Sequence, residues 1–246
     1  MKIIINGATG HMGQKLMEAV ARSEHEAAAL VDPKLVADPS LSMYSSIADF
    51  DGDADVIIDF SHHSAAIQLL EYAKSRKIPV VLATTGQTDE EKKAIYDAGG
   101  EIPIFFAANM SLGVAVTIKL AKAAAAAFPG ADIEIVETHH NRKLDAPSGT
   151  ALSIFEAIKG VRGDAVPVFG REGQKKREKN EIGVHSLRMG NIVGIHEILI
   201  STGSETITIK HEAHDRALFA DGALAAAEFL VTRGAAGIYT MEDLTS

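Results

Sequence analysis

The sequence predicts an α/β fold in two parts, a doubly wound parallel sheet and an α+β part with a mixed, open sheet. Short β-branched runs alternate with segments of helical periodicity through about residue 110, which is typical of repeated β-then-α units. Three strand-like segments then follow one another from residue 184, separated only by tight-turn sequences. We therefore expect one domain over residues 1–110, completed by 217–246, and a second domain over 111–216.

The beginning of the chain has the pattern of a nucleotide-binding unit. A β-branched run at residues 2–6 is followed directly by Gly7–Gly13, with glycines at every third position. Apolar residues then recur at helical spacing to about residue 23, and a second strand at 27–31 ends at Asp32. Strand, glycine turn, helix, strand and acid form the Rossmann-like dinucleotide fingerprint, although Gly-x-Gly-x-x-Gly is its commoner spacing.

Each part of this fingerprint has an expected role. Gly7 would make the tight turn, Gly10 would let backbone amides approach a pyrophosphate, and Gly13 would let the helix pack closely on the strand. A purely structural turn is the alternative interpretation of the glycines. The expected dinucleotide contacts in this segment are Gly7, Ala8, Thr9, Gly10, His11, Met12, Gly13 and Asp32.

The alternation continues with strands at 56–60, 79–83 and 104–107 and helices between them. The second of these helices, to about residue 98, opens with a capping box at Thr88–Glu91. In a doubly wound sheet, ligands bind at the carboxyl ends of the strands. Candidate contacts for the nicotinamide and ribose at these ends are Phe60, Ala83, Thr84, Thr85, Ala107, Ala108, Asn109 and Met110.

The second part is expected to contain helices at 112–128 and about 148–159, and a strand at 132–138. Three later strands, 184–188, 192–202 and 206–212, are predicted to form an antiparallel meander, and 217–232 a final helix. The charged stretch 170–183 is predicted to be a solvated loop, with a basic lid or hinge as the alternative. Such a sheet needs a second covering surface, and a partner subunit would supply one.

The residues after the strand at 132–138 carry the clearest chemistry. His139 and His140 point to opposite sides of an extended backbone, and Lys143 follows three positions later. Ser148 is a plausible N-cap, and Gly149 allows a ligand to approach the free N–H groups of the helix start. A proton donor, a second cation and an anion-binding helix start together suit the reduction of a small, acidic, unsaturated molecule.

The composition of the chain excludes several classes of function. The net charge of −9 argues against a general nucleic-acid surface, and the absence of cysteine excludes disulfides and thiolate chemistry. No apolar run approaches the length of a membrane span, so we expect a soluble cytoplasmic protein without a membrane association. We expect no metal site, because the spacing of His185, His196, His211 and His214 does not match a fixed ligand pattern.

The run Glu134–Ala151 resembles the signature of the 4-hydroxy-tetrahydrodipicolinate reductase family, also called dihydrodipicolinate reductases. The matching positions are Glu134, Glu137, His139, Lys143, Asp145, Pro147, Ser148, Gly149, Thr150 and Ala151. The resemblance covers nearly the full chain, and further matching segments are Gly7–Gly13, Asp59–Ser61, Thr84–Gly86, Ala107–Asn109, Arg188–His196, His211–Ala213 and Phe219–Ala223. A signature of this length is specific to one family.

The resemblance implies reduction of 4-hydroxy-tetrahydrodipicolinate, by way of dihydrodipicolinate, to tetrahydrodipicolinate in the diaminopimelate route to lysine. It implies that His139 is the general acid and Lys143 its partner proton donor. The implied contacts to this cyclic dicarboxylate are His140, Lys143, Ser148, Gly149 and Thr150. It also implies a homotetramer assembled through the mixed sheet.

The cofactor implied by the resemblance is NADH or NADPH. Members that use NADPH well typically carry a basic residue after the ribose acid, whereas here Pro33 follows Asp32. A carboxylate there accepts the 2′-OH of NADH and repels a 2′-phosphate, although Lys34 could still reach one. We expect NADH preference or dual use. The rival functions are another dehydrogenase or imine reductase on the same fold, and a sensor that binds nucleotide without catalysis.

Overall fold

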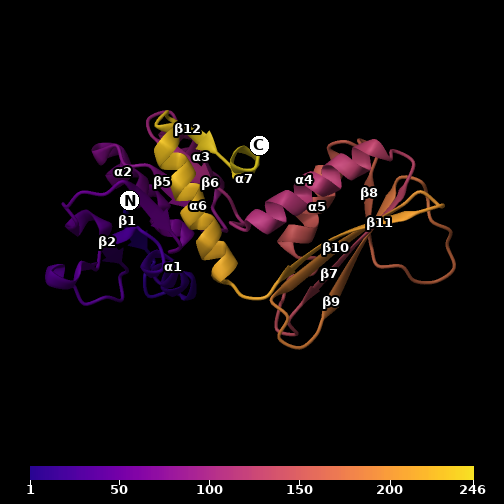
Figure 1. Ribbon diagram of the computed structural model, residues 1–246, viewed down its shortest axis with the longest axis horizontal. Helices are drawn as coiled ribbons and strands as arrows, with labels where there is room; N and C mark the ends of the chain where they lie inside the picture. Colours follow the sequence, from indigo (N-terminus) through magenta and orange to yellow (C-terminus); the bar gives the residue numbers. More distant parts are fainter. The chain divides into compact units, whose positions relative to one another are not determined.

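The computed structural model describes residues 1–246 and divides into two compact units, which are treated separately below (Figure 1). The first unit contains Met1–Leu112 and Arg216–Ser246, and the second contains Gly113–Asp215. The elements of the first unit are β1 Lys2–Asn6, α1 His11–Ala21, β2 Glu26–Val31, β3 Met43–Tyr44, β4 Val56–Asp59, α2 Ala66–Arg76, β5 Val80–Leu82, α3 Asp89–Gly99, β6 Pro103–Phe106, α6 Ala217–Arg233, β12 Gly237–Tyr239 and α7 Met241–Leu244.

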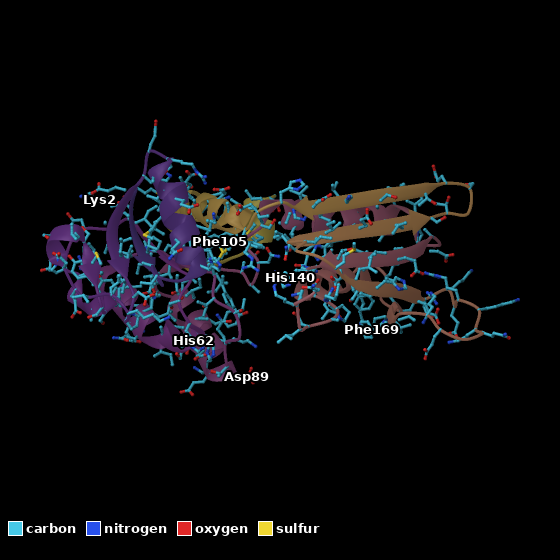
Figure 2. All side chains as sticks on the ribbon, turned by 90° about the horizontal axis from the view of Figure 1, so that it is seen from below. Lys2, His62, Asp89, Phe105, His140 and Phe169 are labelled. Atoms are coloured by element: carbon cyan, nitrogen blue, oxygen red, sulfur yellow. The ribbon has the colours of Figure 1, made fainter.

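The first unit is built on one parallel sheet with the strand order β12-β6-β5-β4-β1-β2-β3. Successive strand residues point to opposite faces, so Ile3 and Ile5 join a core with α1 and α6, whereas Ile4 joins a second core with α2 and α3. Helix α6 packs across β4, β5 and β6 beside α1 (Figure 1). Phe105 on β6 lies inside the first of these cores (Figure 2). This is the doubly wound fold that the sequence predicts.

Helix starts in both units follow local sequence rules. Thr88 and Glu91 form the predicted capping box at the start of α3, with each side chain accepting from the other residue's backbone N–H. Ser148 is the predicted N-cap of α5, and its Oγ accepts from the backbone N–H of Ala151 at 3.2 Å. Strands β3, β8 and β12 and helix α7 were not expected, because they are only two to four residues long and carry little periodicity.

The second unit is a five-stranded mixed sheet with two helices on one face. Its elements are α4 Leu112–Ala127, β7 Asp132–His139, α5 Gly149–Lys159, β8 Val166–Phe169, β9 Glu181–Arg188, β10 Gly194–Ser201 and β11 Thr206–Ala213. The strand order is β11-β10-β7-β9-β8. Side chains of α4 and α5 pack with Ile133, Ile135, Ile182 and Ile198 in one core. Phe169 is exposed on the edge strand β8 (Figure 2).

The predicted meander is wrong in one respect. Strands β10 and β11 are an antiparallel pair, but β7 lies between β9 and β10, and β9 runs parallel to β7. The turn after β9 crosses the end of β7, where His140 N donates to Ile192 O at 2.8 Å and Asn141 N donates to Gly190 O at 3.2 Å. A tight turn therefore joins β9 and β10, which are not neighbours in the sheet. The turn residues alone do not show whether the strands that they join are neighbours.

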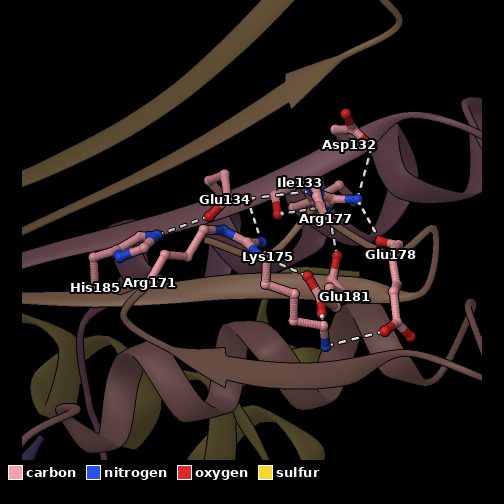
Figure 3. Close-up of polar contacts among 9 residues, drawn as sticks. All are labelled: Asp132, Ile133, Glu134, Arg171, Lys175, Arg177, Glu178, Glu181 and His185. Atoms are coloured by element: carbon pink, nitrogen blue, oxygen red, sulfur yellow. Dashed lines mark hydrogen bonds and ion pairs between the residues drawn. The ribbon is translucent and has the colours of Figure 1, made fainter. Parts of the chain in front are cut away.

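The charged segment before β9 is also more ordered than its composition predicts. Strand β9 already begins at Glu181, inside the stretch expected to be a loop. Arg171 bridges Glu134 Oε1 at 3.0 Å and Glu181 Oε2 at 2.7 Å, and Arg177 Nη1 pairs with Asp132 Oδ1 at 2.7 Å (Figure 3). Opposite charges on β7 and β9 thus hold the basic segment against the sheet, in a geometry that sequence periodicity does not reveal.

Candidate functional site

The glycine turn of the first unit is shaped for close backbone approach. Gly7 has φ +86°, and a Cβ there would lie 2.7 Å from backbone atoms of Phe60 and Ser61. A Cβ on Gly13 would lie 2.2 Å from Gly7 O. Helix α1 has Gly10 as its N-cap residue, so its start has no side-chain cap, and its first turn contains no acidic residue. An uncapped helix start behind a tight glycine turn fits the pyrophosphate of a dinucleotide.

Asp32 lies beside this turn at the end of β2. Its Oδ2 accepts hydrogen bonds from Thr9 Oγ1 at 2.7 Å and Thr9 N at 3.2 Å, and Oδ1 accepts from Lys34 N at 3.0 Å. Burial raises the pKa of Asp32, but these hydrogen bonds outweigh it and the net pKa lies below the usual value. The side chain is therefore a charged acceptor at the position where the fingerprint places the ribose-binding acid.

The structure brings the predicted strand-end residues to one edge of the sheet. Phe60 N donates to Asn6 O at 3.0 Å and Ala83 N to Asp59 O at 3.0 Å, so these segments continue the ladder just beyond the strands. Ala107 N contacts Leu82 O at 3.4 Å. The side chain of Met110 instead faces the core. The remaining predicted contacts here, Thr84, Thr85, Ala108 and Asn109, follow β5 and β6 at the same edge.

In the second unit the central group is Glu137, which is 0% exposed on β7. His139 Nδ1 lies 2.6 Å from its Oε2, and Arg188 Nη1 and Nη2 donate to its two oxygens at 2.8 and 2.7 Å. Ser148 N donates to Oε1 at 3.0 Å. Burial alone would raise the pKa of Glu137, but the hydrogen bonds, that of Arg188 first, lower it to about 2. Glu137 is thus an ionised acceptor for these donors and for the side chain of Ser186.

The ring of His139 is consequently fixed at one nitrogen. With Nδ1 bonded to Glu137, only Nε2 remains to exchange a proton with a ligand. A Cβ built on Gly194 would lie 3.1 Å from this Nε2, so any side chain there would crowd the nitrogen, and the glycine leaves that space open. The arrangement supports a proton donor of defined direction.

Lys143 and the start of α5 lie on the loop that follows β7. Lys143 Nζ pairs with Asp145 Oδ1 at 2.8 Å, and the hydrogen bond from Lys143 lowers the pKa of Asp145 below its usual value. Arg188 Nη2 donates to Asp145 O at 2.6 Å, which ties this loop to β9. At Gly149, the first residue of α5, no atom lies within 4 Å of a built Cβ. The helix start is therefore open to a ligand at the backbone.

Two sequence models match the chain. The model described as dihydrodipicolinate reductase, N-terminus, matches residues 1–110, and the model described as dihydrodipicolinate reductase, C-terminus, matches residues 113–245. The chain is 47% identical to the 4-hydroxy-tetrahydrodipicolinate reductase of Caldanaerobacter subterraneus subsp. tengcongensis, over 99% of this chain and 98% of that one. It is 44% identical to that of Alkaliphilus metalliredigens over 99% and 98%. The chain belongs to the 4-hydroxy-tetrahydrodipicolinate reductase family.

This membership establishes the class of the protein. It is an oxidoreductase of lysine biosynthesis that has the NAD(P)-binding Rossmann fold of its family. Among solved structures, the fold is similar to that of the dipicolinate-bound dihydrodipicolinate reductase from Paenisporosarcina sp., with a TM-score of 0.82, 24% identity, and coverage of 98% of this chain and 97% of that one. None of the helices combines the length and apolar character needed to cross a membrane.

Three partners of the predicted site in this reductase have no site role assigned from the sequence: Glu137, Arg188 and His196. Strand alternation places Glu137 on the same face as His139, and that signal was available. His196 Nε2 lies 3.1 Å from Ser148 Oγ, and its ring packs edge-on against His139 at 5.2 Å. Burial lowers the pKa of His196 to about 4, so the ring is neutral near pH 7. Its contacts depend on strand pairing, which sequence spacing does not supply.

Proposed function

We propose that this reductase converts 4-hydroxy-tetrahydrodipicolinate, by way of dihydrodipicolinate, to tetrahydrodipicolinate. The hydroxyl leaves as water, and the resulting ring gains one hydride and one proton. The observation that carries the proposal is the buried Glu137–His139 pair beside the open start of α5, on a chain whose relatives bear this name over nearly their whole length. Hydride addition leaves negative charge on the ring, which needs a proton donor nearby.

His139 is the proposed general acid and Lys143 the partner proton donor. The Nε2 nitrogen of His139 faces away from Glu137, and the ammonium of Lys143 is held by Asp145 at 2.8 Å. After Nε2 gives its proton, the ring keeps the proton on Nδ1 and the bond to Glu137. Lys143 lies in the short loop that follows His139, where its charge can stabilise the developing anion.

The substrate carboxylates are proposed to bind His140, Lys143, Ser148, Gly149 and Thr150. The open backbone at Gly149 and the positive end of the α5 dipole favour an anion. The Oγ of Ser148 is already engaged by Ala151 N and His196, so the contribution of Ser148 is to hold the two following amides in place. Cationic and amide donors together suit a dicarboxylate.

The dinucleotide is proposed to bind the turn Gly7–Gly13, Asp32 and the strand-end set ending at Met110, and when bound it supplies the hydride. The steric fit at Gly7 and Gly13 supports the turn. The charged carboxylate of Asp32 supports NADH preference or dual use, because a 2′-phosphate would lie beside a like charge. Catalytic efficiency measured with NADH and NADPH tests this assignment, and a large NADPH advantage contradicts it.

The proposed working form is a cytoplasmic homotetramer joined through the mixed sheet. Helices α4 and α5 cover one face of that sheet, while half-buried apolar residues such as Ile195 and Leu199 of β10 lie on the other. Sedimentation of the purified chain at several concentrations measures the assembly. A monomer at all concentrations contradicts this part of the proposal.

The activity is tested by following cofactor oxidation with the freshly made product of dihydrodipicolinate synthase. Oxidation that depends on this product supports the proposed reaction. Oxidation with an amino acid or imine but not with this product points to the other dehydrogenases, and cofactor binding without turnover points to a sensor. A crystal structure with cofactor and dipicolinate then shows whether His139 Nε2 and the start of α5 contact the ligand.

A further inference from the structure

The contacts of Glu137 join two functions that the proposed mechanism treats separately. Its Oε2 holds Nδ1 of the proton donor His139, while its Oε1 accepts from Ser148 N at the helix start that binds a carboxylate. Both oxygens also accept from the guanidinium of Arg188. We infer that Glu137 and Arg188 are a positioning pair that orients the proton donor and keeps the adjacent anion pocket free of a net negative charge. This inference rests on the proposed function.

Glu137 acts on the proton donor through its contact with Nδ1 of His139. A carboxylate that accepts from Nδ1 lets the imidazole ring carry a second proton on Nε2, which is the acid form. A glutamine at position 137 has only one acceptor oxygen for donors that the carboxylate shares between two, so its amide N–H groups face either His139 Nδ1 or the Arg188 and Ser148 donors. When they face Nδ1, the acid form of the ring loses its acceptor.

Arg188 acts on the anion pocket, which is the helix start at Ser148, Gly149 and Thr150. Glu137 is 0% exposed and lies beside the start of α5, where an unpaired carboxylate would repel a substrate carboxylate. The two bonds from Arg188, at 2.7 and 2.8 Å, neutralise that charge with fork geometry. Arg188 also donates to Asp145 O at 2.6 Å, in the loop that carries Lys143. The guanidinium of Arg188 thus neutralises the charge of Glu137 and also holds the loop that carries Lys143.

The chain offers a matched control on the same strand. Glu134 lies three residues before Glu137 on β7, and it pairs with Arg171 Nη2 at 3.0 Å and His185 Nε2 at 2.7 Å (Figure 3). Strand alternation places it on the opposite face from Glu137. Its replacement removes a comparable ion pair without touching the proposed site.

The experiment measures kcat, the KM for the dicarboxylate, and dipicolinate affinity for Glu137→Gln, Arg188→Met, the double variant and Glu134→Gln. Glu137→Gln is expected to lower kcat about 100-fold, with the KM changed less than about threefold and the optimum of kcat moved to lower pH. Arg188→Met is expected to weaken dipicolinate binding about tenfold, and the double variant to recover most of that loss. Glu134→Gln should leave all three quantities within about twofold.

A double-mutant cycle with His139→Gln separates positioning from a structural effect. If Glu137 acts through His139, then Glu137→Gln has little further effect on kcat in the His139→Gln background. Additive losses, or no recovery of binding in the Glu137→Gln/Arg188→Met double variant, overturn the inference.

A failure of the proposed function is distinguishable from a failure of this inference. If His139→Gln keeps full turnover, the catalytic assignment is wrong, whereas the Nδ1 proton of His139 still reports the pairing in the whole protein. The inference expects a far-downfield Nδ1–H resonance that disappears in Glu137→Gln and persists in Glu134→Gln. The same resonance in Glu137→Gln overturns the pairing itself.

Discussion

In the first unit, the glycine turn is shaped by backbone contacts, whereas in the second unit the residues around His139 are held by ionised side chains. A Cβ at Gly7 or Gly13 would lie only 2.2 to 2.7 Å from neighbouring backbone atoms, so neither position can carry a side chain. Glu137 instead collects four hydrogen bonds from His139, Arg188 and Ser148. A backbone turn of this shape suits the pyrophosphate that all dinucleotides share, whereas a charged network is suited to the control of a proton.

The largest expected effect is on proton transfer in the second unit. His139→Gln should lower kcat about 10³-fold, because Gln cannot supply a proton from the position of Nε2. Dipicolinate and NADH affinities should stay near those of the unchanged protein. His185→Gln is the matched control, since His185 bonds Glu134 at 2.7 Å on the other face of the sheet. Steady-state kinetics and calorimetry check both, and equal kcat values for the two variants would remove His139 from the mechanism.

In the first unit, the corresponding substitution alters the shape of the glycine turn. Gly13→Ala introduces a Cβ 2.2 Å from Gly7 O and 2.8 Å from Ala8 backbone atoms, so the turn or α1 must move. We expect a loss of about 3 kcal/mol in unfolding free energy and weaker NADH binding. Gly163→Ala, where no atom lies within 4 Å of the new Cβ, should change neither. Urea unfolding and NADH fluorescence titration measure the two effects.

This contrast explains what could be predicted from the sequence. The fold class, the five predicted strands of the first unit and the caps at Thr88 and Ser148 are confirmed, because each depends on a local pattern a few residues long. The glycine turn is similarly local. The structure has the expected steric demands at Gly7 and Gly13, where a Cβ would clash with backbone atoms.

The errors and omissions concern contacts between distant segments. The position of β7 between β9 and β10 depends on hydrogen bonds from His140 and Asn141 to the turn after β9, and turn composition does not encode them. The bond between Glu137 and Arg188 joins positions 51 apart in the sequence. Local pattern therefore yields candidates for the side chains that carry the chemistry, but it does not identify the side chains that hold these candidates in place.

A fall in pH should destabilise the folded second unit through protonation of His196. Burial lowers its pKa from 6.5 to about 4, so between these values the unfolded chain binds a proton that the folded chain does not. The stability from this group is fully present above pH 6.5 and is lost as the pH falls to about 4, by about 3 kcal/mol. Urea unfolding at several pH values should show this slope, and His196→Asn should flatten it. An unchanged slope in the variant assigns the loss to another group.

In the first unit, the carboxylate of Asp32 beside the glycine turn is expected to affect the choice between NADH and NADPH. Asp32→Asn keeps an acceptor for Thr9 while it removes the negative charge. We expect the ratio of kcat/KM for NADPH over NADH to rise at least about tenfold, because the repulsion of a 2′-phosphate is relieved. Urea unfolding of the variant is the control for folding. A ratio that does not move would show that Asp32 does not face the ribose.

The smallest expected effects come from the two helix caps, which use similar chemistry in the two units. Thr88 Oγ1 accepts from Glu91 N at 3.2 Å, and Ser148 Oγ accepts from Ala151 N at 3.2 Å. Thr88→Ala and Ser148→Ala should each lower the unfolding free energy by about 1 kcal/mol. Only Ser148→Ala is expected to raise the KM for the dicarboxylate, by about threefold, because α5 begins at the proposed anion pocket and α3 does not. Equal stability losses with an unchanged KM in both variants would make the start of α5 a structural cap and would move the carboxylate contacts elsewhere.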